Sequence, residues 1–94
     1  MDDELLKLLS FVKSSTHRLK TLKALYDGDK NPTQISKTTG IRVTHTSNVL
    51  RLFKDRDLAI CLNEDRRKNR VYQLTDTGRE IGRIIEETEK RNKK

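Results

Sequence analysis

Residues 31–57 read NPTQISKTTGIRVTHTSNVLRLFKDRD and contain two helix-forming segments in close succession. Asn31 can cap the first helix, Pro32 suits its first position, and Gln34 can reach back to complete a capping box. Thr39-Gly40 is expected to end this helix, because glycine suits the left-handed conformation that follows many helices. The segment therefore predicts a short, well-delimited helix.

A second helix is predicted from about Arg42 or Val43 to about Asp57. Gly40-Ile41 forms nearly the whole connection between the two helices. So short a connection indicates a tight helix-turn-helix.

After this helix the apolar pattern changes to the alternation that is typical of strands. Two short runs are expected to pair as a hairpin, 58–62 (LAICL) and 71–74 (VYQL). Leu58, Ile60 and Leu62 share one side of the first strand. The intervening segment 63–69 is entirely polar and is expected to form the hairpin loop.

Three further helices are predicted outside this region. Apolar residues at helical spacing mark 4–12 and 17–26, and Ser15 is the expected N-cap of the latter. Residues 75–78 (TDTG) precede a final helix, and its apolar-free tail, 86–94, is expected to fray.

The predicted order is four helices, two strands and one helix. This is a mainly α chain with a small β-hairpin (α+β), laid out as a winged helix-turn-helix with a three-helix core, a two-stranded wing and extra terminal helices. We expect one domain over 1–94, with an N-terminal helix in 1–14, the core in 15–74 and a C-terminal helix in 75–94.

The chain is strongly basic. Its 94 residues include 21 Lys and Arg against 14 Asp and Glu, a net charge of +7. Such an excess favours an anionic partner such as DNA, RNA or a membrane surface, because neutralised phosphates release counterions. Solubility alone is the alternative explanation.

Other features argue for a soluble cytoplasmic protein without membrane contact. No apolar run approaches the roughly 18 residues of a membrane span, and the acidic start, Asp2-Asp3-Glu4, is unlike a secretory signal. Cys61 is the sole cysteine, so no internal disulfide is expected. Its place in an alternating strand favours a small buried hydrophobe.

No catalytic or metal-binding pattern stands out. His17 and His45 are far apart in sequence, and neither has a partner at a recognised metal-ligand spacing. Neither a nucleophile–base pair nor a phosphate-cradling glycine loop is evident. We therefore expect no metal, no cofactor and no enzymatic activity.

The helix beginning near Arg42 has two distinct faces at about 100° per residue. Its expected core face carries Val43, Thr46, Val49, Leu50 and Phe53. Short polar and cationic side chains occupy the opposite face, as a helix that reads the major groove requires. The candidate DNA-binding residues here are Arg42, Thr44, His45, Ser47, Asn48, Arg51 and Lys54.

Within this set, the N-terminal residues are expected to meet base edges, whereas Arg51 and Lys54 are expected to meet phosphates. Thr33 and Gln34 begin the preceding helix, where backbone N–H groups can hold a phosphate. Simple capping is an equal alternative for Gln34.

The hairpin loop supplies a second basic group. It consists of Arg66, Arg67, Lys68 and Arg70. Four cations within five positions suit contact with phosphates or the minor groove. The acidic Glu64 and Asp65 in the same loop offset only part of this positive charge. A mobile solvated loop is the alternative.

These motifs together resemble small winged-helix transcriptional regulators. The resemblance rests on 31–36 (NPTQIS), Gly40-Ile41, 44–52, the hairpin and 74–80 (LTDTGRE). ArsR and MarR proteins are the best-known relatives, and short archaeal regulators are more similar still. The resemblance implies that the helix beginning near Arg42 enters the major groove and that the wing lies along the flanking backbone or minor groove.

The sequence departs from the family pattern at two positions and lacks its sensing elements. Thr46 stands where an apolar residue is usual, and Asp57 stands where glycine is usual. No effector ligand is implied. We expect a sequence-specific regulator that binds double-stranded DNA. A winged-helix protein–protein interaction module in a transcription assembly is the alternative, and RNA binding is weaker because no aromatic platform is present.

The terminal helices offer more apolar surface than the lean core requires, so a homodimer is expected. The residues assigned to its interface are Leu5, Leu8, Leu9, Val12, Ile81, Ile84 and Ile85. Packing of these helices onto their own domain is the alternative.

Overall fold

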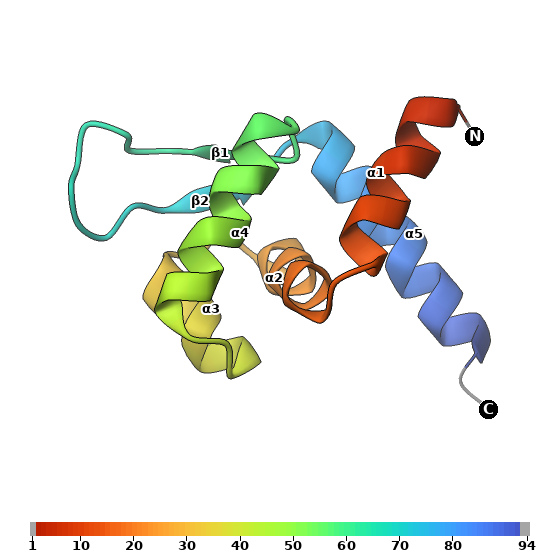
Figure 1. The fold of residues 1–94 in the computed structure, drawn as a ribbon, viewed down its shortest axis with the longest axis horizontal. Helices are drawn as coiled ribbons and strands as arrows, with labels where there is room; N and C mark the ends of the chain where they lie inside the picture. Colours follow the sequence, from red (N-terminus) through yellow and green to blue (C-terminus); the bar gives the residue numbers. More distant parts are fainter. Residues whose placement is uncertain (1, 93–94) are drawn as a thin grey trace.

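The structure is a computed structural model that describes residues 2–92 (Figure 1). Within this range the elements are α1 (Asp3–Lys13), α2 (Thr16–Asp27), α3 (Pro32–Thr39), α4 (Val43–Asp55), β1 (Ala59–Cys61), β2 (Tyr72–Leu74) and α5 (Asp76–Asn92). The predicted order and the mainly α fold class with one hairpin are confirmed. Met1, Lys93 and Lys94, at the ends of the expected domain, lie outside the described residues.

The helix boundaries follow local capping chemistry. Ser15 accepts a hydrogen bond from the Arg18 amide at the start of α2. Asn31 and Gln34 form the predicted capping box, in which each side chain accepts a backbone N–H bond of 2.8 Å. Gly40 ends α3 with φ at 78°, a left-handed conformation that glycine adopts without strain.

Helix α2 lies at the centre of the molecule, and the other elements surround it (Figure 1). Leu22 of α2, Ile35 of α3, and Leu50 and Phe53 of α4 are fully buried members of one apolar cluster. Burying each such side chain stabilises the fold by about 1.5–3 kcal/mol. This packing fixes the angle at which α4 presents its opposite face.

On α4, Val43 differs from the expected core pattern, whereas Thr46 lies in the core as expected. Val43, expected on the core face, has a side chain that is 44% exposed, because it lies on the same outer side of the helix as Ser47 and Arg51, with which it lines a surface hollow. Thr46 is fully buried, and its hydroxyl has no hydrogen-bond partner among residues 2–92. An apolar residue would fill that position without this cost.

The hairpin pairs Ala59 with Leu74 and Cys61 with Tyr72 in antiparallel register. Of the three residues expected on one side of the first strand, Ile60 and Leu62 are exposed, whereas Leu58, which precedes β1, is fully buried. The strand turns its Ala59 side toward the core instead. Cys61, expected to be buried, is only partly so.

A connection that the sequence did not reveal holds the hairpin against the helices. The amide of Tyr72 donates to the Lys30 carbonyl over 2.9 Å, and the Lys30 amide donates to the Tyr72 carbonyl over 3.2 Å. Lys30 directly precedes Asn31, the N-cap residue of α3. The hairpin is therefore tied by its backbone to the start of the helix-turn-helix.

Asp57 lies in the turn between α4 and β1 with φ at 58°. This is the left-handed region, in which glycine is unstrained and aspartate is tolerated better than most other residues. The backbone thus makes a turn that glycine would suit, despite the aspartate side chain.

The terminal helices pack on their own domain more than expected. Val12, Ile81 and Ile85 are completely or almost completely buried in the core cluster, so their assignment to a dimer interface is wrong. These three positions face the central helices rather than solvent. Leu5, Leu8, Leu9 and Ile84 are only partly buried.

The tail of α5 also differs from expectation. Residues 86–92 continue the helix instead of fraying. Glu89 accepts hydrogen bonds of 2.8 and 3.0 Å from Lys23 of α2, which connects this tail to the central helix. No helix in the described part of the chain is long and apolar enough to cross a membrane.

We predict that Gly78→Ala destabilises the fold by about 1–3 kcal/mol through overpacking. An added Cβ at this position would lie 2.2 Å from the carbonyl oxygen of Leu58. That carbonyl accepts a 3.0 Å hydrogen bond from the Thr75 amide and has little freedom to move. Urea denaturation should show a lower midpoint with an unchanged slope. Thr77→Ala is the matched control, and equal effects of the two changes would contradict this explanation.

Candidate nucleic-acid interface

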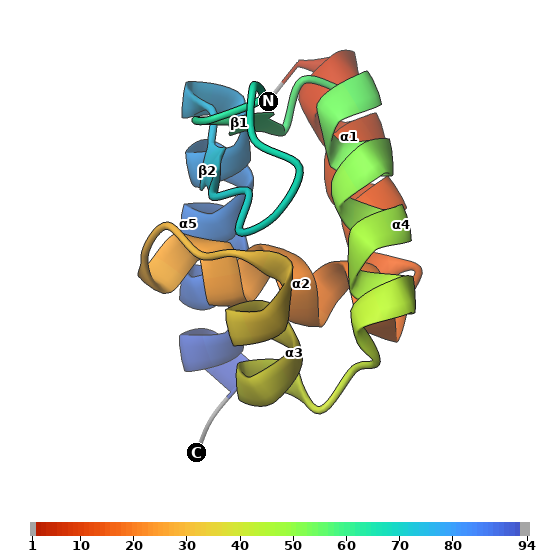
Figure 2. The same ribbon diagram turned by 90° about the vertical axis from the view of Figure 1, so that its left-hand side faces the viewer.

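One face of the molecule combines the start of α3, the outer side of α4 and the β1–β2 loop. Figure 2 looks onto this face. A hollow of about 590 Å³ lies between the three elements. It is lined by Asn31, Pro32, Thr33, Val43, Ser47, Arg51, Lys54, Asp55, Arg67, Lys68, Asn69, Arg70 and Tyr72. Residues predicted separately on three segments are thus brought to one basic surface.

The outer side of α4 is accessible along its whole length. Every candidate residue on or beside this helix is exposed, namely Arg42, Thr44, His45, Ser47, Asn48, Arg51 and Lys54. Among residues 42–54 no acidic side chain interrupts this face, and Asp55 ends the helix. The helix presents hydrogen-bonding groups of both polarities, flanked by positive charge.

The two candidates at the start of α3 differ in their surroundings. Thr33 is exposed and lines the hollow. Gln34 is exposed too, but its side-chain oxygen accepts the Asn31 amide hydrogen bond of the capping box. Of the two roles expected for Gln34, phosphate binding and helix capping, the structure shows the capping role.

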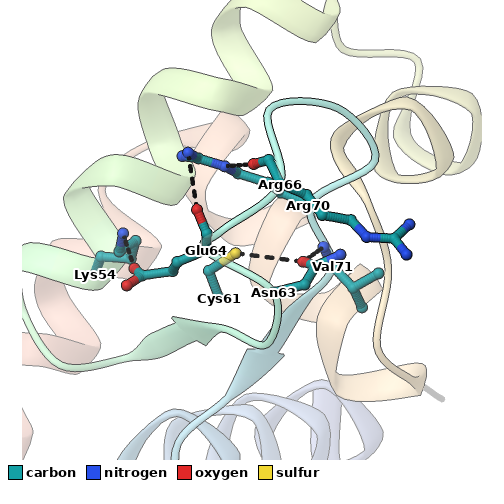
Figure 3. Close-up of polar contacts among 7 residues, drawn as sticks. All are labelled: Lys54, Cys61, Asn63, Glu64, Arg66, Arg70 and Val71. Atoms are coloured by element: carbon teal, nitrogen blue, oxygen red, sulfur yellow. Dashed lines mark hydrogen bonds and ion pairs between the residues drawn. The ribbon is translucent and has the colours of Figure 1, made fainter.

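Asn63 organises the base of the wing loop, a role that sequence inspection missed (Figure 3). Its Oδ1 accepts a 2.8 Å hydrogen bond from the Val71 amide and a 3.6 Å contact from the Cys61 thiol. Its Nδ2 donates to the Asn69 carbonyl over 3.1 Å. A signal was available, since asparagine at a strand end commonly bonds to nearby backbone.

The four wing cations divide into two kinds. Arg70 is half-buried, and its guanidinium donates to the carbonyls of Arg66 and Glu64 over 2.6 and 3.2 Å (Figure 3). It holds the loop in shape. The side chains of Arg66, Arg67 and Lys68 are exposed, and Arg67 and Lys68 line the hollow.

An ion pair joins α4 to the wing. The Lys54 ammonium donates to Glu64 over 2.5 Å (Figure 3). This hydrogen bond, reinforced by the opposite charge, lowers the pKa of the Glu64 carboxyl and raises the pKa of Lys54. Lys54 was expected to meet phosphate, and here its charge is already compensated by a carboxylate.

Comparison with known proteins adds evidence on the fold. No family model matches the chain, and no curated protein sequence matches it. Solved structures do match. The winged helix-turn-helix DNA-binding domain of Mb0332 from Mycobacterium bovis has a TM-score of 0.70 and 19% identity, covering 97% of this chain and 90% of that one. This chain adopts the winged-helix fold.

Two further winged-helix matches are larger proteins. The MarR family regulator SPO1453 from Silicibacter pomeroyi has a TM-score of 0.73 at 13% identity and covers 94% of this chain. The C30AH42A mutant of Lactococcus lactis ZitR has a TM-score of 0.68 at 11% identity and covers 83%. The chain spans only 65% and 53% of these two proteins, respectively.

We predict that Lys54→Met raises the pKa of the Glu64 carboxyl toward its ordinary value. Because the folded protein lowers this pKa, the ion pair contributes above the pKa of the unfolded carboxyl and is lost as pH falls through the folded value. An NMR pH titration of the Glu64 carboxyl measures the change.

Arg51→Met is the matched control, because it removes a positive charge from an exposed position of the same helix. Arg51 is not among the groups that shift the pKa of the Glu64 carboxyl. The rise should therefore be much smaller than with Lys54→Met. An unchanged Glu64 titration in Lys54→Met would show that the ion pair does not form in solution.

Proposed function

We propose that this protein is a transcriptional regulator that binds double-stranded DNA in a sequence-specific manner. The observation that carries the proposal is the single basic face on which α3, α4 and the wing converge. DNA is the partner best suited to this face, because its phosphates lie on both sides of a groove that admits a helix. The mode of action is binding and not catalysis.

In this proposal α4 enters the major groove. Arg42, Thr44, His45 and Asn48 stand near its N-terminal end, which usually reaches the base edges. Asn48 has the donor and acceptor pair that matches adenine. Arg51 lies further along the helix at the hollow and is assigned to a phosphate.

The wing takes the flanking backbone or the minor groove. Arg66, Arg67 and Lys68 are its exposed cations and the best phosphate contacts. Arg70 supports them by holding the loop. Thr33, which lines the hollow, completes the phosphate-binding set with its own hydroxyl and amide, because Pro32 has no N–H and the Gln34 amide is bonded to the Asn31 side chain.

The solved structures support this choice of class. Mb0332 is described as a homodimeric DNA-binding domain and a possible ArsR-family regulator, and SPO1453 as a MarR family transcriptional regulator. At 13–19% identity these likenesses concern the fold. The proposal for this chain rests on the charge and exposure of its own residues.

One observation favours the alternative of a protein-interaction module. Leu52 of α4 and Ile60 of β1 are 40% and 43% exposed, and Leu62 after β1 is 50% exposed. Exposed apolar side chains of this size can form part of a protein contact. The hollow between α3, α4 and the wing is lined instead by cations that include Arg51, Arg67 and Lys68, which keeps DNA the better partner.

We also propose a homodimer formed through the terminal helices. Figure 1 shows α1 and α5 at the opposite end of the molecule from the wing loop, so pairing through them leaves the basic face free. Leu6 of α1 is 47% exposed and lines a shallow hollow with Leu9. Leu9 and Ile84 keep accessible surface, unlike the buried residues of the same helices.

Binding to duplex DNA should fall steeply with salt. If a dimer makes six to ten phosphate contacts, affinity should drop by about 10³–10⁵ between 50 and 200 mM salt. Gel-shift titration against duplex DNA, single-stranded DNA and duplex RNA measures this response. Equal affinity for all three, or a flat response to salt, would favour the protein-interaction module.

Two variants separate base reading from backbone contact in the same assay. Asn48→Ala should relax sequence preference by about 1–3 kcal/mol against the preferred base. Arg67→Ala should weaken binding to all sequences alike and lower the salt slope by about one. Site selection with each variant distinguishes the roles, and an unaltered preference in Asn48→Ala would remove Asn48 from the reading set.

Sedimentation at micromolar concentration should give twice the chain mass of 11.0 kDa. The double change Leu9→Asp with Ile84→Asp should shift the protein toward monomer, because it puts charge on the remaining accessible apolar positions. Lys7→Asp, on an exposed position of α1, is the control for added charge alone. A wild-type monomer at these concentrations would refute the interface.

A further inference from the structure

Two histidines that are distant in the sequence meet in the structure. His17 stands in the first turn of α2 and His45 in the first turn of α4, and their ring centres lie 5.1 Å apart with the planes tilted by 35°. Both side chains are exposed. They are the only two histidines in the chain, and the fold places them next to each other.

The pair is set in place by the core and not by contact between the rings. Thr21 follows His17 by one turn of α2 and is fully buried, and Thr46 directly follows His45 and is fully buried as well. Helices α2 and α4 pack against each other. Figure 2 shows the start of α2 beside the N-terminal part of α4.

Arg18, which directly follows His17 in the sequence, contacts α1 and not the histidine pair. The guanidinium of Arg18 lies 4.2 Å from the centre of the Phe11 ring and donates to the Phe11 carbonyl over 2.7 Å. It is therefore engaged with α1. The N-cap residue of α4, Arg42, is exposed and makes no capping hydrogen bond.

The separation of the rings suits coordination of one ion. Metal–nitrogen bonds of about 2.0–2.1 Å at a tetrahedral angle place the centres of two imidazole ligands about 5 Å apart. The observed separation of 5.1 Å agrees with that value. Imidazole is a preferred ligand of zinc, nickel and copper, whereas magnesium and calcium require oxygen ligands.

We propose that His17 and His45 form a binding site for a divalent late transition-metal ion that bridges α2 and α4. Within residues 2–92 no third His, Cys, Asp or Glu joins the pair to make a larger ligand group. Water therefore completes the coordination. The site selects nitrogen-binding ions over magnesium, and it clips together the starts of the two helices whose packing forms the core.

The experiment is a Zn²⁺ titration of the tag-free protein followed by the imidazole signals in NMR spectra. Two histidines give two sets of signals, and both should shift together to an endpoint of one ion per chain. His17→Gln and His45→Gln should each weaken binding about tenfold or more, since two linked ligands bind far better than either alone. Mg²⁺ should cause no shift.

Cys61→Ser is the matched control, because Cys61 is the only cysteine of the chain and lies on β1. It should leave the titration unchanged. Zn²⁺ should also raise the melting temperature of the wild type and of Cys61→Ser, but not of the two histidine variants, since an ion that binds only the folded state stabilises it. Neither measurement involves DNA.

Three results would overturn the proposal. First, the histidine signals do not shift at a large excess of Zn²⁺. Second, each single variant keeps the wild-type affinity at its remaining histidine, which would show independent binding. Third, Cys61→Ser loses the response to Zn²⁺ while the histidine variants keep it. Circular dichroism of each variant verifies that these exposed substitutions leave the fold intact.

Discussion

The packing of α4 onto α2 is the contact on which the rest of the structure depends. Leu22, Leu50 and Phe53 are fully buried in the cluster that joins these helices. With one side of α4 committed to this cluster, the helical period directs Thr44, Asn48 and their neighbours outward. The same contact places the starts of both helices side by side. The proposed DNA-reading surface and the proposed metal site therefore both depend on the apolar packing between α2 and α4.

The position of the wing has a different origin, because it depends on backbone hydrogen bonds and not on apolar burial. Lys30 and Tyr72 exchange two such bonds just before α3. Asn63 and Arg70 then shape the loop beyond the strands. As a result, Arg67 and Thr33 line one hollow although the sequence separates them widely. Directional bonds of this kind bring the phosphate-binding candidates to a common face.

The terminal helices serve their own domain first. Val12 and Ile85 are buried and complete the core. The whole chain has only two phenylalanines and two tyrosines, so few large aromatic side chains are available to fill that core. The exposed Leu6 and partly buried positions such as Leu9 and Ile84 remain for a partner. A small domain buries only a limited fraction of its surface on folding. Its most apolar side chains are therefore needed in its own core and are not available for a dimer interface.

The sequence by itself determined the order of the elements, the Asn31 capping box and the outward face of α4, because these depend on local hydrogen bonds and helical periodicity. It could not assign Val12 and Ile81 to the core, since periodicity identifies an apolar face without naming what covers it. The Lys54–Glu64 pair and the meeting of His17 with His45 likewise join residues on different elements. Only the tertiary structure decided these, because such distances depend on how helices pack and not on spacing along the chain.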